Sequence, residues 1–210
     1  MSDSTTANWR EARRRGARGT IVVSAWDLVR EVGLSALSLR ELARRSGITT
    51  PTVYAYFDSK RAIYDAMFGQ AAEDFAEWMA EPVHTGDPVA DLTVDARRFV
   101  EFCTADIPRY QLLFQHTVPG FSPSPQSYEP AIRALERTRQ MLRGAGVSDP
   151  RYLDLWTALT TGLVDQQIAN DPGGTRWSRL IDDAVRMFVS YCHDHEPGDS
   201  DQRPASSEPV

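Results

Sequence analysis

Residues 37–65, LSLRELARRSGITTPTVYAYFDSKRAIYD, constrain the fold more than any other part of the chain. Ser38 and Glu41 have the spacing of a capping box, in which a hydroxyl and a carboxylate accept hydrogen bonds from free N–H groups at a helix start. Gly47 can adopt the left-handed conformation that ends a helix. We therefore expect a short helix over about residues 39–46.

A second short helix is expected directly afterwards. Thr49 is a favourable N-cap residue, and Pro51 falls in the first turn, where the missing N–H of proline costs nothing. Two short helices joined by a turn that contains glycine form a helix-turn-helix, whose second helix enters the major groove of DNA. A helical apolar pattern over residues 18–33 would add a preceding helix and complete a three-helix head.

Charge is distributed unevenly along the sequence. The 210 residues carry a net charge of −6, which by itself argues against a nucleic-acid partner. Residues 1–60, however, carry ten Arg or Lys against six Asp or Glu, whereas residues 61–210 carry thirteen against twenty-three. A basic head on an acidic body is expected when only one end of a protein meets phosphate.

Other classes of protein find little support in the sequence. No apolar run reaches the roughly 18 residues of a membrane span, and the first residues lack the apolar core of a signal peptide, so we expect a cytoplasmic protein. Cys103 and Cys192 lie far apart and indicate neither a disulfide framework nor a thiolate metal site. Residues 192–195, Cys-His-Asp-His, can bind metals, but a helix end that runs into a polar tail lacks fixed geometry. Phosphate-loop, dinucleotide and zincin motifs are absent, so we expect no enzyme, no cofactor and no metal.

Within the head, apolar spacing separates core residues from surface residues. Arg40, Arg44 and Arg45 would project from the first helix of the pair. An arginine can bind guanine bidentately, whereas hydroxyls and tyrosines mostly anchor phosphates. Tyr54 and Phe57 are ambiguous, and the rapid alternation of YAYF favours burial for both. The expected core residues are Leu39, Leu42, Ala43, Ile48 and Val53.

The run SLRELARRSGITTPTVYAYFDSKRAIYDAM resembles the DNA-binding head of the tetracycline-repressor-like (TetR-like) transcriptional regulators, over about residues 18–68. The Leu-x-x-x-Ala-x-x-x-Gly-Ile turn, the Thr-Val-Tyr-x-Tyr-Phe helix and the Ser-Lys-x-x-Ile start of the next helix carry the resemblance. It implies that Tyr54 faces DNA rather than the core, that Lys60 holds a phosphate and that Arg40 reaches a base. The full set of expected DNA-binding residues is Arg40, Arg44, Thr49, Thr50, Pro51, Thr52, Tyr54, Tyr56 and Lys60.

The rest of the sequence has helical patterns throughout and no strand pattern. We predict an all-α protein of about nine helices, with a three-helix helix-turn-helix head and a helical-bundle body for ligand binding and dimerisation. Residues 1–17 are assigned to a flexible basic arm, 18–65 to the DNA-binding domain, 66–193 to the effector-binding and dimerisation domain and 194–210 to a disordered tail. The arm fits a DNA contact and a solvated leader equally well. Residues 118–130, VPGFSPSPQSYEP, form the clearest predicted loop.

Two predicted helices near the C-terminus, over residues 150–170 and 176–193, are apolar on more than one face. One side of each could pack in its own body and the other against a second copy, in a two-fold four-helix interface. A dimer would place two recognition helices about one helical turn of DNA (~34 Å) apart. The alternative is a monomeric core. The expected interface residues are Trp156, Leu159, Leu163, Leu180, Ala184, Phe188 and Tyr191.

The body is also rich in aromatic residues, which is typical of a pocket between helices and of a plain core alike. The resemblance favours a pocket, since TetR-like regulators bind a small effector in the body, which alters the separation of the heads and the affinity for the operator. The implied function is a ligand-responsive homodimeric repressor of a palindromic operator. The alternative is a helical small-molecule-binding or enzymatic protein whose head contacts other proteins. The expected effector residues are Trp78, Phe99, Phe102, Cys103, Tyr110, Phe114, His116, Trp156 and Thr160.

Overall fold

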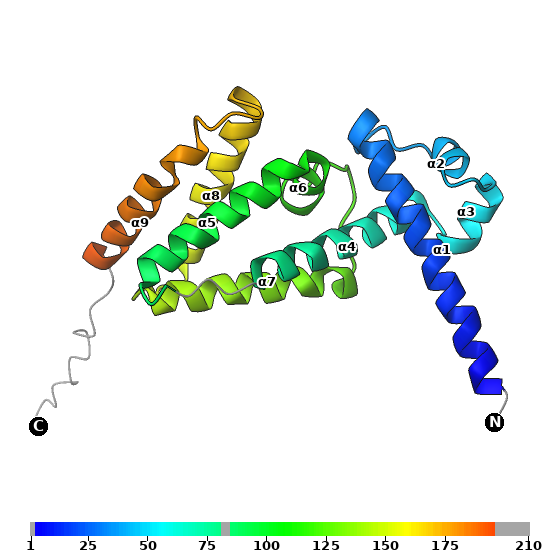
Figure 1. Ribbon diagram of the computed structural model, residues 1–210, viewed down its shortest axis with the longest axis horizontal. Coiled ribbons are helices and arrows are strands. Elements are labelled where there is room, and N and C mark those ends of the chain that lie inside the picture. The colour runs from blue at the N-terminus through cyan, green and yellow to red at the C-terminus, as the bar shows by residue number, and fades with distance from the viewer. Residues whose placement is uncertain (1–2, 81–84, 196–210) are drawn as a thin grey trace, which may run out of the picture. The chain divides into compact units, whose positions relative to one another are not determined.

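The computed structural model describes residues 3–80 and 85–195, and within those ranges it contains helices and no strand (Figure 1). The all-α prediction is confirmed. The helices are α1 (Asp3–Val32), α2 (Leu39–Arg45), α3 (Thr50–Tyr56), α4 (Lys60–Ala80), α5 (Pro88–Ala105), α6 (Ile107–Phe114), α7 (Pro125–Gly144), α8 (Arg151–Asn170), the short 3-10 helix η1 (Ser178–Leu180) and α9 (Ile181–His195). None of the described helices is both long and apolar enough to cross a membrane.

The chain divides into two compact units. One comprises Met1–Glu81 with Phe102–Ala134, and the other comprises Pro82–Glu101 with Leu135–Val210. The first unit therefore holds α1 to α4 and α6, the second holds α8 and α9, and both α5 and α7 contribute to each. The predicted domain boundary between residues 65 and 66 falls inside α4.

The N-terminal segment differs from the flexible arm predicted over residues 1–17. Helix α1 begins at Asp3, so most of that segment has a helical backbone. Alanine, arginine and glutamate are good helix formers, and a helix already nucleated by the packed residues after Arg18 extends at little cost. Sequence reasoning missed this extension because the segment has no apolar stripe.

The proline-rich stretch after α6 is shorter than the loop predicted over residues 118–130. Helix α7 begins at Pro125, and Pro130 lies inside it. The Ser124 hydroxyl accepts a hydrogen bond from the Ser127 amide at 3.3 Å and so caps the helix, and Pro125 occupies the first helical position, where its missing N–H costs nothing. Pro130 removes only one backbone hydrogen bond near the start of a 20-residue helix.

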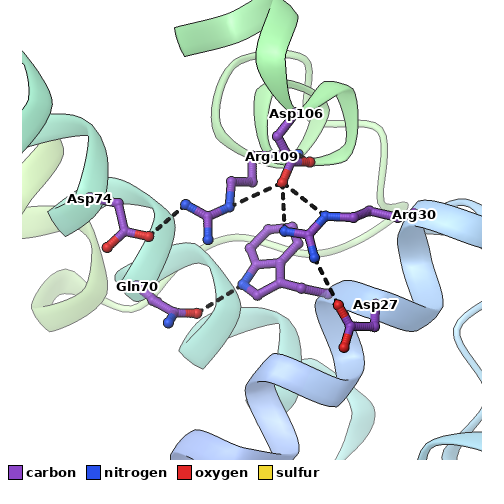
Figure 2. Close-up of polar contacts among 7 residues, drawn as sticks. Asp27, Arg30, Gln70, Asp74, Asp106 and Arg109 are labelled. Carbon is purple, nitrogen blue, oxygen red and sulfur yellow. Dashed lines mark hydrogen bonds and ion pairs between the residues drawn. The ribbon is translucent and has the colours of Figure 1, made fainter.

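Polar contacts join α1, α4 and α6 in the first unit (Figure 2). The Trp26 indole of α1 donates to the Gln70 side chain of α4 at 2.9 Å. Arg30 of α1 pairs at 2.7 Å with Asp106, the N-cap residue of α6. Arg109 of α6 pairs at 2.5 Å with Asp74 of α4, and its guanidinium lies 5.3 Å from the centre of the Trp26 ring. These contacts fix α1 against the two helices.

The second unit is held by aromatic packing between α8 and α9. The Trp156 and Phe188 ring centres are 5.1 Å apart, and both side chains are buried. A buried ion pair joins α5 to α7, with Arg137 Nη1 2.5 Å from Asp95 Oδ1. Burial raises the pKa of the Asp95 carboxyl, and the hydrogen bond from Arg137 opposes that rise.

The C-terminal helix begins and ends later than the prediction over residues 176–193. Residues 178–180 form η1, and α9 continues to His195. The Gln167 side chain of α8 accepts from the backbone N–H groups of Trp177 and Ser178 at 2.9 and 3.1 Å, which stabilises the start of η1. The predicted disordered tail starts at residue 194, but Asp194 and His195 belong to α9, and residues 196–210 lie outside the described residues.

Candidate nucleic-acid interface

Helix α2 is not stabilised by the predicted capping box. Ser38 has the extended backbone of an N-cap residue, but its side chain makes no capping hydrogen bond. The Glu41 carboxylate instead pairs with Arg44 at 2.6 Å, and this hydrogen bond holds the pKa of Glu41 below its usual value. An arginine one turn away competes for the carboxylate because it offers a charge-assisted bond, whereas the backbone N–H is neutral.

Helix α3 begins as predicted. The Thr49 hydroxyl accepts a hydrogen bond from the Thr52 amide at 3.3 Å, and the two hydroxyl oxygens are 2.8 Å apart. Gly47 has φ +66°, the left-handed conformation that closes the preceding helix. Pro51 lies in the first turn. The backbone of the turn and the start of α3 are therefore fixed by local chemistry.

The two short helices are held together by a small apolar core. Leu42 and Val53 are fully buried, Ala43 is buried, and Phe57 directly after α3 is also buried. Leu39 and Ile48, which were predicted to belong to this core, are only half-buried. Helices of seven residues are not stable alone, so this packing is what keeps α3 helical.

Two charged contacts orient the pair against α1. Arg45 of α2 pairs with Glu31 of α1, which lowers the pKa of the Glu31 carboxyl. Arg18 of α1 donates to the backbone carbonyl oxygen of Tyr56, and its guanidinium lies 4.1 Å from the centre of the Phe57 ring. Sequence reasoning missed the role of Arg18 because its partners are 38 and 39 residues away.

The outer surface of the pair carries most of the predicted DNA-binding residues. Arg40, Thr49 and Pro51 are exposed, and Tyr54 exposes 50% of its surface. The exposure of Tyr54 agrees with the TetR-like resemblance, and the burial predicted from spacing is wrong for Tyr54 and right for Phe57. Val53 is the one buried residue that the seven-residue helix α3 contributes to the core, so the adjacent Tyr54 can point outward. Thr50, Thr52 and Tyr56 are half-buried.

Lys60 stands at the first position of α4. Its ammonium group donates to the Ser35 carbonyl oxygen at 3.3 Å and lies 5.5 Å from the centre of the Tyr64 ring. The Tyr64 hydroxyl in turn donates to the Leu34 carbonyl oxygen, and burial raises the pKa of Tyr64 to about 12. A lysine at a helix N-terminus combines its own charge with the partial positive charge of the helix, which suits a phosphate.

The residues predicted for an effector pocket fall into both compact units. Six lie in the first unit, where the Phe75 ring packs in T-shaped geometry against Phe102 and Phe114, with ring centres 5.1 and 5.4 Å apart. Tyr110 and Cys103 are buried, whereas His116 is exposed, at a left-handed φ of 47°. The other three are Phe99, Trp156 and Thr160, and the Thr160 hydroxyl donates to the Trp156 carbonyl oxygen of its own helix at 2.9 Å.

The residues predicted for a dimer interface divide into buried and exposed groups. Trp156, Ala184 and Phe188 are buried within the described chain. Trp156 of α8 and Phe188 of α9 contact each other within this chain, and a role of the three residues in a dimer interface stays a prediction. Leu159 and Leu163 are half-buried, and the more exposed apolar residues are Leu155 of α8, Leu180 of η1, and Met187 and Tyr191 of α9.

The histidines near the end of α9 have their own partners. The His193 ring nitrogen Nε2 lies 2.8 Å from the Ala145 carbonyl oxygen, and the His195 Nδ1 lies 2.8 Å from the Tyr191 carbonyl oxygen. Across the part of the chain that the structure describes, no group of three or more His, Cys, Asp or Glu side chains could hold a metal ion.

The head has recognisable relatives. Residues 21–67 match the family described as "Bacterial regulatory proteins, tetR family". The tetracycline repressor protein class A from transposon 1721 of Escherichia coli is 44% identical over 48 residues, which cover 23% of this chain and 22% of that relative. The match thus spans about a quarter of the length of the curated relative, and it confirms the resemblance seen in the head.

Solved structures extend the similarity of fold to the body. A protein of unknown function from Rhodococcus sp. RHA1 superposes with a TM-score of 0.71 and 19% identity, over 84% of this chain and 95% of the other. A single-residue variant of TetR from Acinetobacter baumannii AYE, solved in complex with minocycline, gives a TM-score of 0.58 and 21% identity, over 84% and 96%. At these identities the likeness concerns the fold alone.

Proposed function

We propose that this chain, whose head belongs to the tetR family of bacterial regulatory proteins, is a homodimeric transcriptional repressor. It binds a palindromic DNA operator through the helix-turn-helix and is released when a small molecule binds the helical body. The observation that carries the proposal is the exposed, polar outer surface of α2 and α3, two packed helices of which α3 is capped by Thr49, within the segment that matches the family. Residues 18–65 are the DNA-binding domain and residues 66–193 the effector-binding and dimerisation domain.

Each side chain of the head has a distinct task in this proposal. Arg40, Thr50 and Thr52 contact base edges in the major groove, where an arginine pairs with guanine and a threonine contacts a base acceptor or a thymine methyl. Tyr54 and Lys60 bind phosphates and so set the register of α3 on the duplex. Arg44, Thr49, Pro51 and Tyr56 complete the surface that faces DNA.

The dimer is proposed to form through α8 and α9. The exposed apolar residues Leu155 of α8, Leu180 of η1, and Met187 and Tyr191 of α9 suit a two-fold helix interface, and Leu180 and Tyr191 are among the interface residues predicted from the sequence. Two copies are needed because each recognition helix reads one half-site.

Release by an effector requires that the small molecule binds one arrangement of the two heads more tightly than the other. The aromatic residues of the body provide apolar contacts for such a ligand, and the minocycline complex of the relative from Acinetobacter baumannii supports a small-molecule effector here. The Arg30–Asp106 and Arg109–Asp74 pairs connect α6 to α1 and α4, so a shift of α6 would be transmitted to the head (Figure 2). No catalysis is required, and the protein acts in the cytoplasm, where bacterial DNA lies.

The direct test measures binding to DNA. Duplexes are selected from a random-sequence library with the unaltered chain, and the enriched duplex is titrated with an Arg40→Ala, Thr50→Ala double variant. We expect affinity to fall about 100-fold, because each lost base contact is worth roughly 1–3 kcal/mol. An Arg143→Ala, Thr175→Ala variant removes the same two residue types from exposed positions outside the head and is the matched control. Equal affinity of the two variants, with unchanged circular dichroism, would favour the alternative of a head that contacts protein.

A further inference from the structure

The N-terminal half of α1 is an exposed and unbalanced positive segment. Residues 9–20 contain five arginines and one glutamate. Arg13, Arg14 and Arg15 are exposed, and within the described residues none of the three makes an ion pair. Arg30, Arg44 and Arg45 of the same head are all paired with carboxylates. The three N-terminal charges are therefore available to an external anion.

Arg18 determines where this positive segment lies. Its contacts with the Tyr56 carbonyl oxygen and the Phe57 ring hold α1 beside the C-terminal end of α3. Arg14 precedes Arg18 by about one helical turn, and at 1.5 Å per residue residues 13–15 lie roughly 5–8 Å further along the axis. Figure 1 shows the N-terminal half of α1, in dark blue, extending beyond α2, α3 and α4.

We propose that Arg13, Arg14 and Arg15 form a second DNA-binding surface, which contacts the phosphates that flank the groove occupied by α3. The inference rests on the proposed function, since it requires α3 to lie on DNA. Phosphates border each groove of the duplex, and the helical extension reaches past the recognition helix on its C-terminal side. The contact is independent of base sequence and adds affinity and salt dependence, because each bound phosphate releases condensed counterions.

The two glycines of this segment suggest that helix formation and DNA binding are linked. Gly16 and Gly19 lie within α1, and a Cβ added at either position would meet nothing within 4 Å. Glycine inside a helix disfavours it relative to alanine. The two glycines therefore lower the helical stability of this segment. Contacts with phosphates would favour the helical form and offset that loss.

The first experiment compares salt dependence. The Arg13→Gln, Arg14→Gln, Arg15→Gln variant and the unaltered chain are titrated with the selected duplex at several salt concentrations. The slope of log K against log salt should fall by about 0.9 for each lost phosphate contact, hence by roughly 3 per bound protomer. An Arg143→Gln, Arg176→Gln, Arg179→Gln variant changes the net charge equally at exposed positions of the other unit and should keep the full slope.

The outcomes separate this inference from the proposed function. If the N-terminal variant keeps the slope of the control variant while the Arg40→Ala, Thr50→Ala variant loses binding, the second surface is wrong and the helix-turn-helix proposal stands. If the Arg40→Ala, Thr50→Ala variant binds as well as the unaltered chain, the proposed function fails first.

The second experiment tests the helical form of the contact. Duplexes trimmed to the half-sites and duplexes with about ten extra flanking base pairs are bound to the Gly16→Ala, Gly19→Ala variant. If the extension binds as a helix, the variant should gain several-fold in affinity for the long duplex and nothing for the trimmed one. A loss of affinity confined to the long duplex would mean that the arm binds in an extended form and would overturn the helical surface.

Discussion

The α2–α3 pair and the α8–α9 pair are both packed helices, yet different forces determine them. The head helices have seven residues each and are defined by local features: the Thr49 cap, the left-handed Gly47 and a few buried residues such as Leu42 and Val53. The α8 and α9 helices have 20 and 15 residues and are defined by packing between them. Caps and turns depend on residues that are adjacent in the sequence and can be predicted from it. Packing between two helices depends on residues far apart in the sequence and cannot be predicted in this way.

The largest expected effect lies in the α8–α9 pair. Trp156→Ala should lower the free energy of unfolding by about 4 kcal/mol, because it removes the contact with Phe188 and leaves a cavity in the core. Chemical denaturation followed by circular dichroism measures the loss. Leu155→Ala changes a neighbour that is 43% exposed and should cost much less. Similar losses for the two variants would mean that this pair is not packed as described.

Met187 on the outer side of α9 tests the proposed dimer interface, because its side chain is 64% exposed. Met187→Asp should leave the circular dichroism spectrum unchanged and shift the sedimentation coefficient from that of a dimer to that of a monomer, since a carboxylate would be buried in the interface. A dimer that survives this change would remove the proposed α8–α9 interface.

An intermediate effect is expected where the head meets α4. Tyr64→Phe removes one of the two hydrogen bonds that the Leu34 carbonyl oxygen accepts, the other coming from the Leu37 amide, and should cost about 1–2 kcal/mol. The pKa of Tyr64 is raised from 10.0 to about 12, so the folded state favours the protonated hydroxyl. The advantage of the unaltered chain over Tyr64→Phe is therefore complete below pH 10 and should shrink as the pH rises from 10 toward 12.

The smallest effect distinguishes the two helix caps of the head. Thr49→Ala removes a capping hydrogen bond and should cost about 1 kcal/mol in denaturant titrations. Ser38→Ala removes a hydroxyl that makes no capping bond and should cost well under half of that. If the two substitutions cost the same, Ser38 caps α2 in solution and the predicted capping box is right after all.

The sequence was a good guide to the head and a partial guide to the body. It located α3 and its cap, and it placed Leu42 and Val53 in the core. Its spacing argument misplaced Tyr54, which the TetR-like resemblance put on the outer surface. In the body the helical periods were correct, and Trp156 and Phe188, which were assigned to a dimer interface, are buried within the chain itself. An apolar side chain on a helix is equally suited to a partner in the same chain and to one in another chain.

By itself the sequence determined that the chain is helical, that its basic end carries a helix-turn-helix and that the head resembles the tetR family. Only the tertiary structure decided which of these charges are paired within the protein and which make no ion pair in its described residues. Arg44 and Arg45 are paired by carboxylates on α2 and α1, and Arg18 by a carbonyl group 38 residues away, whereas Arg13, Arg14 and Arg15 project from an extended α1. A charge is visible in the sequence, but its partner depends on distances that exist only after folding.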